Sequence, residues 1–467
     1  MLNHGINIHK NDAKFIDTQK TSSGIPFYVG AWPCHMAGGY TGKPQLATSF
    51  EDAKKLGGYS EEWRDSDGSP KWSLCQAMYS HFSLFGMSPA IFFNVFDPAS
   101  HKTAVSETAH DVVDKTVTLP GTAIDDSGLT VKDIETLLEK GTDYETAYID
   151  GNLIITLLSG STHYSATSLT VGYNAADPSQ ITEEDISAAF ESIESCKGSL
   201  GIIPDLLCAP GWSQTPTVAS VMATKAANVN GLFKSKAVVD LDSASGKVTS
   251  YDEIAEYKAT NGYTDNAEIV CWPLAKVGEK VFDMSVIVCG TIARTDEGNG
   301  GLPFESPSNK KIPITGLVTA DGEDVILTLN EADIVSYTCG VVTAIPFNGW
   351  RLWGNYTGDK KFICCDRMID FIGKEFVNRY MDYVDRPLTR VVIDAILNDF
   401  NAFLAGLTKN NALYGGEMVY IEDNNPREDL LSGKFRLDCK QASPVPAQQI
   451  DAYIEYDVTL LDAALNV

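Results

Sequence analysis

The chain has 467 residues, of which 44% are hydrophobic, so it can form about two to four domains with large cores. Its 62 acidic residues outnumber its 36 basic residues, and the net charge of −26 argues against direct nucleic-acid binding, because phosphate contacts need clustered Lys and Arg. No run reaches the roughly 18 to 20 apolar residues of a membrane helix, since Val286–Ala293 is far too short. The first residues, Met-Leu-Asn-His-Gly, contain no charged leader followed by an apolar stretch, so we expect neither a secretory signal nor membrane insertion.

Residues 24–100 are predicted to form the first part of an α/β core. Strands are expected at Ile25–Ala31 and Pro89–Phe96, with helices at Ser49–Leu56 and Lys71–Phe85 between them. The second helix is expected to be amphipathic, with one apolar face formed by Trp72, Cys75, Tyr79 and Phe82. The second strand is almost continuously apolar, which is typical of a strand covered by helices on both faces.

Residues 101–179 break this pattern. Polar and apolar residues alternate in Lys115–Leu119 and Asn152–Leu158, and Leu169–Tyr173 supplies another strand. Asp177-Pro178 marks the exit from the segment, because this dipeptide favours a turn. We therefore predict an inserted β domain here.

The α/β alternation returns in residues 180–346. Strands are predicted at Asp205–Cys208, Ala237–Leu241 and Ile269–Leu274. Helices are predicted at Thr182–Cys196, from Pro216 onward, after a Ser-x-x-Glu capping box at Ser250–Glu253, at Ser285–Arg294 and at Asn330–Tyr337. The simplest arrangement is a mainly parallel sheet with helices on both faces, built from two parts of the chain that are not contiguous in sequence.

A hydrolytic site in this core would need a serine within reach of a histidine base that a carboxylate orients. All seven histidines lie at or before residue 163, so the first core part offers only His35 and His81, and the later part has none. No Gly-x-Ser-x-Gly elbow occurs. His81 is more simply explained as part of a helix face and His35 as a loop residue, so we expect no catalytic residues.

Three further patterns bear on whether the chain holds a cofactor or a metal ion. Asp240 and Asp242 follow a predicted strand, where α/β enzymes often place acids, although helix capping and loop hydrogen bonds are the ordinary explanation. The run Gly38–Lys43 resembles a phosphate loop, but it lacks the first glycine and the Ser/Thr that would hold magnesium. His4 and His9 have no further ligands nearby, and the ten cysteines form no Cys-x-x-Cys pair. We expect no cofactor, no metal site and no disulfide framework.

Residues 347–467 do not continue the α/β alternation of the preceding segment. The run Phe347–Tyr356 pairs glycines with Trp350 and Trp353, so a tight turn must pack two large rings beside Arg351. Ordinary core packing explains such a motif when it is taken alone. Two long helices, Asp366–Val384 and Pro387–Thr408, are predicted to follow it, and strands come after them.

Both ends of the chain alternate like strands that have no core of their own. Near the N-terminus, Ile6 and Ile8 alternate with polar residues, and a polar stretch, Asn11–Ser23, follows. Near the C-terminus, from about residue 447 onward, one face of a predicted strand is formed by Ile450, Ala452, Ile454, Tyr456 and Val458. These strands pair either within their own subunit or with a neighbouring one, and the residues alone leave both possibilities open.

The chain resembles the contractile tail sheath proteins of phages, phage-tail-like bacteriocins and contractile injection systems. The resemblance rests on Gly349–Asn355, on Phe27–Gly30 entering the first strand, on Ala209–Gly211 and on Asp385–Leu388. Tyr356-Thr357 departs from the pattern, because many sheath proteins have an arginine before the threonine. This departure puts one local contact in doubt.

The resemblance implies a fold and a mechanical function. It implies a subtilisin-like core in residues 24–100 and 180–346, an outward-facing β-sandwich in residues 101–179 and an α+β C-terminal domain from residue 347. It also implies that residues 1–23 and about 447–467 are arms that add strands to neighbouring subunits. The subunits would stack as hexameric rings around an inner tube, with baseplate and tail terminator proteins as further partners, and would be assembled in the bacterial cytoplasm.

Two other functions agree less well with the sequence. An α/β hydrolase with an unrecognised site would depend on His81 or Asp240, but nothing in the sequence names a substrate. A surface protein or adhesin would share the acidic, β-rich character and should also carry an export signal, which is not visible.

Overall fold

The computed structural model describes residues 23–125 and 128–465. The chain divides into two compact units between Ile396 and Leu397. Ile6, Ile8, His4 and His9 lie outside the described residues.

The first unit is built on a six-stranded sheet with the strand order β14-β13-β12-β1-β3-β2. Its strands are β1 (Pro26–Gly30), β2 (Gln45–Ala47), β3 (Ala90–Asn94), β12 (Leu206–Cys208), β13 (Lys236–Asp240) and β14 (Glu268–Cys271). All neighbouring strands are parallel except β2, which pairs antiparallel with β3 at one edge. The sequence predicts the parallel strands because they are apolar throughout, but it does not predict the short strand β2.

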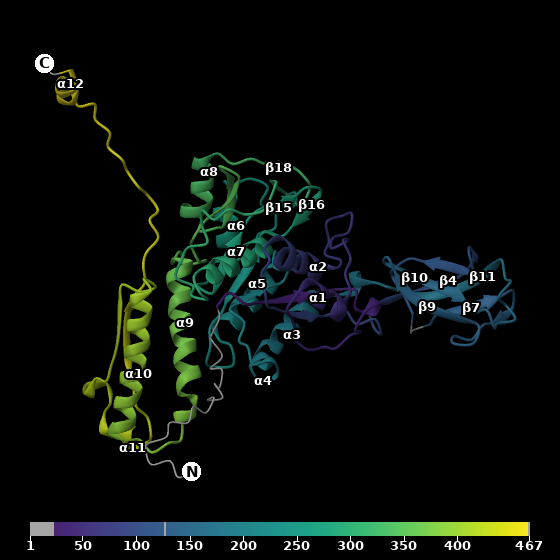
Figure 1. Cartoon of the computed structure of the whole chain (residues 1–467), viewed down its shortest axis with the longest axis horizontal. Helices are drawn as coiled ribbons and strands as arrows, with labels where there is room; N and C mark the ends of the chain where they lie inside the picture. The colour runs from purple at the N-terminus through teal and green to yellow at the C-terminus, as the bar shows by residue number, and fades with distance from the viewer. Residues whose placement is uncertain (1–22, 126–127, 466–467) are drawn as a thin grey trace, which may run out of the picture. The chain divides into compact units, whose positions relative to one another are not determined.

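Helices cover both faces of this sheet (Figure 1). The helices in this part of the first unit are α1 (Phe50–Gly57), α2 (Ser73–Met78), α3 (Glu183–Ala189), α4 (Cys196–Leu200), α5 (Pro216–Ala227), α6 (Ile254–Thr260) and α7 (Met284–Gly298). Phe27 packs edge-to-face on Phe190, in the 3₁₀ turn after α3, while the adjacent Tyr28 packs on His81, in the π-helical turn after α2. Successive β1 side chains therefore pack on opposite faces of the sheet.

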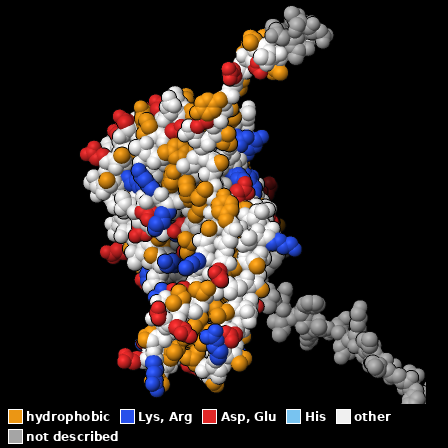
Figure 2. Space-filling model, turned by 90° about the vertical axis from the view of Figure 1, so that its left-hand side faces the viewer, with side chains coloured by type: hydrophobic (Ala, Val, Ile, Leu, Met, Phe, Trp, Pro, Cys, Tyr) orange, Lys and Arg blue, Asp and Glu red, His pale blue; other side chains and the backbone are white. Residues whose placement is uncertain are grey.

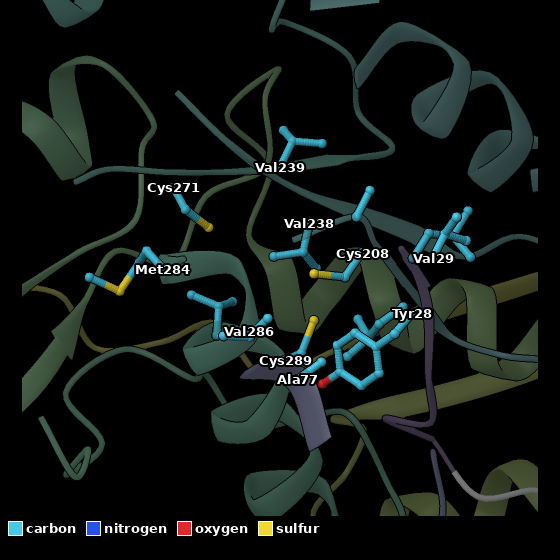
Figure 3. Close-up of a cluster of buried hydrophobic side chains, with 14 of the residues drawn as sticks. Tyr28, Val29, Ala77, Cys208, Val238, Val239, Cys271, Met284, Val286 and Cys289 are labelled. Atoms are coloured by element: carbon cyan, nitrogen blue, oxygen red, sulfur yellow. The ribbon is translucent and has the colours of Figure 1, made fainter. Parts of the chain in front are cut away.

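The core between the sheet and α7 is close-packed and rich in sulfur. Figure 3 shows Tyr28, Cys208 and Cys289 together, and all three are completely buried. The Cys208 thiol lies 3.3 Å from the Ser285 hydroxyl. Burial raises the pKa of the Cys208 thiol well above its ordinary value, so these thiols behave as small apolar groups.

Two of the predicted helices differ from expectation. The predicted amphipathic helix Lys71–Phe85 is a short α2 followed by a π-helical turn, Tyr79–Leu84, and every α2 residue is buried because the segment packs on both the sheet and α7. The predicted capping box at Ser250 is incomplete. The Glu253 carboxylate accepts from the Ser250 amide, but α6 begins only at Ile254 and has no side-chain cap.

Residues 102–176 form two separate antiparallel sheets, with the strand orders β5-β10-β9 and β4-β11-β7-β8, and β6 also pairs with β11 (Figure 1). The strands are β4 (Lys102–Asp111), β5 (Thr116–Leu119), β6 (Ala123–Ile124), β7 (Thr130–Asp133), β8 (Thr136–Leu137), β9 (Tyr144–Ile149), β10 (Asn152–Leu157) and β11 (Ser168–Ala176). Both sheets contribute to one hydrophobic cluster, which includes Val117, Leu153 and Val171. This cluster is distinct from that of the six-stranded sheet.

The turn between β7 and β8 is strained. Ile134 has a φ of +56°, and a β-branched side chain is strongly disfavoured there. Its side chain is 84% exposed, so burial does not compensate for the strain. We expect Ile134→Asn to stabilise this part of the chain by about 1 kcal/mol, because asparagine tolerates the left-handed conformation. Urea denaturation would measure the change.

Leu137→Asn is the matched control, since Leu137 is 64% exposed and has no positive φ. Its effect should stay within about 0.5 kcal/mol. Equal effects of the two substitutions would show that removal of an exposed apolar side chain, and not release of backbone strain, changes the stability.

Two further small sheets follow the parallel sheet along the chain. A small antiparallel sheet contains β15 (Leu274–Val277), β16 (Lys280–Phe282), β17 (Gly316–Val318) and β18 (Asp324–Val325), and a hairpin contains β19 (Thr343–Pro346) and β20 (Trp350–Trp353). Helix α8 (Leu329–Asp333) begins with a complete capping box and continues as a π-helical turn to Thr338. The sequence does not predict this small sheet.

Helix α9 (Ile363–Tyr380) is fastened to the α/β core by buried ion pairs. Both Arg367 terminal nitrogens donate to the Asp296 carboxylate of α7, at 3.1 and 2.6 Å. Lys374 pairs with Asp205 at the start of β12, and Lys236 of β13 pairs with Asp366. These contacts are charge-assisted and shielded from water, so they fix the position of α9 on the core.

Helix α10 (Arg390–Lys409) spans the boundary between the two units. It is the one helix among the described residues whose length and mean hydropathy of 1.4 would allow it to cross a membrane, which the sequence analysis did not anticipate. Its apolar residues recur at helical spacing, and the buried ones are Ile393, Ile396, Phe400, Leu404 and Leu407. One side of the helix therefore packs inside the protein.

The second unit contains, besides the end of α10, the strands β21 (Gly415–Val419) and β22 (Asp438–Ala442) and the helices α11 (Arg427–Leu431) and α12 (Val458–Leu465). The Asn401 side-chain amide donates to the Met418 carbonyl at 2.9 Å, and its oxygen accepts from the Met418 amide at 2.7 Å. These two bonds hold the β21–β22 hairpin against α10.

Candidate assembly interface

The tryptophan motif forms one side of the β19–β20 hairpin. Arg351 donates from Nε to the Phe347 carbonyl at 2.9 Å and from a terminal nitrogen to the Asn309 carbonyl at 2.7 Å. Trp353 donates from Nε1 to Asp333 of α8 at 2.9 Å. Trp350 and Trp353 are half-buried, and Leu352 between them is completely buried in the cluster of the six-stranded sheet. The motif thus anchors the hairpin to the α/β core.

The tight turn has the backbone that its sequence requires. Asn348 has a φ of +52° and Gly349 a φ of +92°, a conformation that asparagine and glycine tolerate best. At the other end of the strand, a Cβ atom on Gly354 would lie 2.9 Å from the Val342 Cα, so glycine is required there for close approach.

Residues 449–457 of the predicted C-terminal strand pair with no strand among the described residues. Residues 443–457 contain no strand and run as an extended trace between β22 and α12 (Figure 1). Ile450, Ile454 and Tyr453 are 86%, 94% and 96% exposed, and Ala452 and Tyr456 are also exposed. Figure 2 shows orange apolar side chains standing on this tail. Such exposure is costly in water, so the segment has the properties of an unpartnered interface.

One residue of the predicted strand is in a different element. Val458 is the first residue of α12 and not the last residue of a strand. The sequence from Val458 is Val-Thr-Leu-Leu-Asp-Ala-Ala-Leu, which contains several helix-forming residues. Val458 fits both the alternation of a strand and the apolar repeat of a helix, and the helix begins there.

The β21–β22 hairpin offers edges to which such a segment could bind. The two strands pair antiparallel over five residue pairs, from Gly415–Ala442 to Val419–Asp438. Within the described part of the chain, no third strand joins this sheet. Each strand therefore has an outer edge whose backbone groups can pair with another strand.

The candidate catalytic residues do not form a site. His81 lines a cavity beside Ser23 and Gly24, which precede β1, whereas Asp240 is the last residue of β13. Because β1 and β13 belong to the same parallel sheet, these positions lie at opposite edges of it. Burial lowers the pKa of His81 to about 4, so its imidazole is neutral at physiological pH.

Asp240 belongs to a buried polar network. One carboxylate oxygen accepts from the Ser285 amide at 2.8 Å, and the other lies 3.2 Å from the Ser213 hydroxyl. Asp283 is fully buried nearby, where it pairs with Arg64 and accepts from Gln76. Burial, reinforced by the Asp283 charge, raises the pKa of Asp240 to about 7. No histidine takes part, so the network lacks a general base for Ser213.

This raised pKa predicts a pH-dependent stability. The folded-state pKa of about 7 lies above the ordinary value of 3.8, so the carboxyl favours folding below about pH 4 and this contribution is lost as the pH rises through 7. We expect Asp240→Asn to be more stable than the parent at pH 8 by roughly 2 to 4 kcal/mol, with a difference that shrinks toward pH 4. Urea unfolding from pH 5 to pH 8 would measure this difference.

Asp242→Asn is the matched control, because Asp242 accepts from the Ala244 amide in the adjacent half-buried loop, a bond that asparagine can keep. Its pH profile should follow that of the parent. A parent-like profile for Asp240→Asn as well would show that Asp240 is ionised in the folded protein at neutral pH.

The comparison with known proteins gives a consistent result. No protein-family model matches the chain. Over 399 residues the chain is 24% identical to the tail sheath protein of Burkholderia phage BcepMu, covering 78% of this chain and 81% of that protein. It is 28% identical over 137 residues to the tail sheath protein of Escherichia phage P2, covering 28% of this chain and 34% of that protein.

Solved structures match a larger share of the chain. A chain of the anti-feeding prophage baseplate superposes with a TM-score of 0.58 at 13% identity, covering 98% of this chain and 99% of that one. A chain of the PVC sheath complex in its contracted state gives a TM-score of 0.56 at 12% identity, with coverages of 98% and 99%. The sheath tail protein from Desulfitobacterium hafniense gives a TM-score of 0.51 at 12% identity, with coverages of 90% and 94%. The fold is shared over nearly the whole length.

Proposed function

Because this chain belongs to the contractile tail sheath proteins, we propose that it polymerises helically, as stacked hexameric rings, around an inner tube. In the extended state the lattice is metastable, and contraction drives the tube through a target envelope. The protein is structural and not an enzyme, as its relatives are. The hydrolase alternative is not favoured, because its two candidate residues lie at opposite edges of the sheet.

The exposed C-terminal tail is the observation that carries this proposal. Ile450, Ala452, Ile454 and Tyr456 would form one face of a strand added to the β21–β22 hairpin of a neighbouring subunit. Ile6 and Ile8 would do the same from the other end of the chain. A strand of five or six residues gains about four to six hydrogen bonds at roughly 1 kcal/mol net each, so such arms can hold while the subunits reorient.

The other parts of the chain take complementary roles in this proposal. The subtilisin-like core, residues 24–100 and 180–346, supplies the rigid lattice contacts, and residues 101–179 form a β-sandwich on the exterior. The α+β C-terminal region from residue 347 receives the arms. Asn11–Ser23 serves as a hinge. The inner tube, baseplate and terminator proteins are the expected partners, and assembly takes place in the bacterial cytoplasm.

Electron microscopy of the purified chain, alone and with its companion tube protein, tests the proposal. Hollow helical cylinders from the intact chain, absent or shortened for a variant that lacks residues 1–20, are the expected result. Monodisperse single subunits under every condition would contradict it.

A further inference from the structure

A groove at the C-terminal edge of the parallel sheet is not used by the contacts described above. Its volume is about 560 Å³. One wall is the connection from β13 to α6, at Ser245 and Thr249–Tyr251, and the other is Asp321–Leu327, which includes β18. Trp272, directly after β14, lies at its base and donates from Nε1 to the Val248 carbonyl at 2.8 Å. The hydrogen bond of Trp272 thus ties the base of the groove to the first wall, and both walls are mostly connecting segments.

The rim of this groove carries uncompensated negative charge. Asp321, Glu323 and Asp324 are exposed, and none of them has a cation within salt-bridge distance among the described residues. Glu331 also lines the groove, but its carboxylate caps α8 through Thr328. Lys247 lies in the connection that supplies the first wall and is exposed, but it does not line the groove. The rim therefore favours a ligand that carries positive charge.

Apolar side chains line part of the groove, beside Thr249, Ser250 and Thr319. Leu327 and Trp272 are buried, and Val325 and Tyr251 are half-buried. Ile326, at the lip, is 85% exposed, which is unusual for a large apolar side chain beside acidic residues. A segment that combines lysines with adjacent large apolar side chains would satisfy both the rim and the interior.

The chain itself contains such a segment outside the described residues. Lys14, Phe15 and Ile16 are consecutive, and Lys10 and Lys20 flank them. Residues 10–20 hold three lysines against two aspartates, a net charge of +1, whereas the whole chain has a net charge of −26. This segment is therefore complementary to the groove in both charge and hydrophobicity.

The topology favours binding between different copies. Ser23 precedes β1 and is fixed at the N-terminal edge of the parallel sheet, where its hydroxyl donates to Asp296 at 2.7 Å. The groove lies at the opposite edge, after β13 and β14. A segment that extends from the N-terminal edge of the sheet in one copy and binds the groove at the opposite edge in the next copy makes a head-to-tail contact. Repetition of such a contact builds rings or helices.

We propose that the groove between residues 245–251 and 321–327 binds residues 10–20 of a second copy of this chain, with Phe15 and Ile16 in the groove and the lysines at the acidic rim. This inference rests on the proposed function, since it assigns a lattice contact to that assembly. The contact is distinct from the strand pairing of the terminal arms, because it uses side-chain complementarity at a different sheet. It restricts the hinge proposed for Asn11–Ser23 to the residues that follow Lys20.

Peptide binding tests the contact without requiring assembly. A fluorescent peptide of residues 9–21 is titrated with full-length protein held below the concentration at which it polymerises. We expect saturable binding that weakens at least tenfold for Glu323→Lys combined with Asp324→Lys, and that weakens as NaCl rises from about 50 to about 300 mM. Asp252, just before α6, and Glu256, in its first turn, are exposed and do not line the groove, so Asp252→Lys combined with Glu256→Lys is the matched control and should bind like the parent. Equal binding by both double variants, or no binding by the parent, would overturn the proposal.

Charge reversal in the full chain tests the assembly role. Lys14→Glu should reduce the yield of cylinders, and Lys14→Glu with Glu323→Lys should restore part of it. Cylinders that form equally in parent and single variant, without peptide binding, would overturn this inference and leave the proposed function intact. An absence of cylinders from the parent would contradict the proposed function, while the peptide titration would still decide whether the groove binds this sequence.

Discussion

Removal of residues 444–467 is expected to abolish formation of hollow cylinders while leaving the folded subunit intact. Residues 449–457 of the tail pair with no strand among the described residues, and Ile450, Tyr453 and Ile454 are almost completely exposed. If the tail binds a neighbouring subunit, as proposed, its loss removes contacts between subunits and very little of the core. Negative-stain electron microscopy would count the cylinders, and thermal unfolding of the unassembled subunit should change by no more than a few degrees.

Point variants in the tail distinguish its binding as a β-strand from an effect of merely shortening the chain. An added strand buries alternate side chains, so Ile454→Ser should reduce assembly strongly, whereas Glu455→Ser, on the opposite face, should have little effect. Equal effects of the two substitutions would mean that the tail contributes by length or charge and does not bind as a strand in fixed register.

The strands of the parallel sheet were predictable because burial on both faces leaves a simple composition. The runs around Phe27, Phe92 and Val238 are apolar without alternation, and all three residues are completely buried. The start of α3 was also predictable, since Thr182 and Asp185 form a capping box that depends only on local sequence.

The features that the sequence did not predict depend on long-range contacts or on very short elements. β18 contains only Asp324–Val325, too short for any periodicity to be recognised. The groove combines residues 245–251 with residues 321–327, and no local pattern indicates that they meet. The terminal alternation indicated a strand up to Val458, but helix-forming residues end it there. Whether Ile450–Tyr456 pair with another subunit stays a prediction.

Replacement of Arg367 is expected to cause the largest loss of subunit stability. Its side chain is 5% exposed and that of Asp296 1% exposed, and the two form a bidentate pair. Arg367→Met should cost about 3 to 5 kcal/mol, because Asp296 would remain buried and, among the described side chains, would keep only the Ser23 hydroxyl as a donor. Urea unfolding monitored by tryptophan fluorescence would measure the loss.

A double-mutant cycle identifies the cause of this loss. Combining Arg367→Met with Asp296→Asn removes both charges, so a large part of the stability should return, since desolvation of an unpaired carboxylate is the main cost. Arg390→Met is the matched control, because Arg390 and Asp394 form an exposed pair one turn apart on α10 and should contribute little. If the double variant is as unstable as Arg367→Met alone, the lost packing of the arginine side chain, and not its charge, holds α9 on the core. The distinction matters for contraction, because a helix fixed by charge and geometry keeps its orientation while the terminal arms move, whereas a helix held only by packing could shift with them.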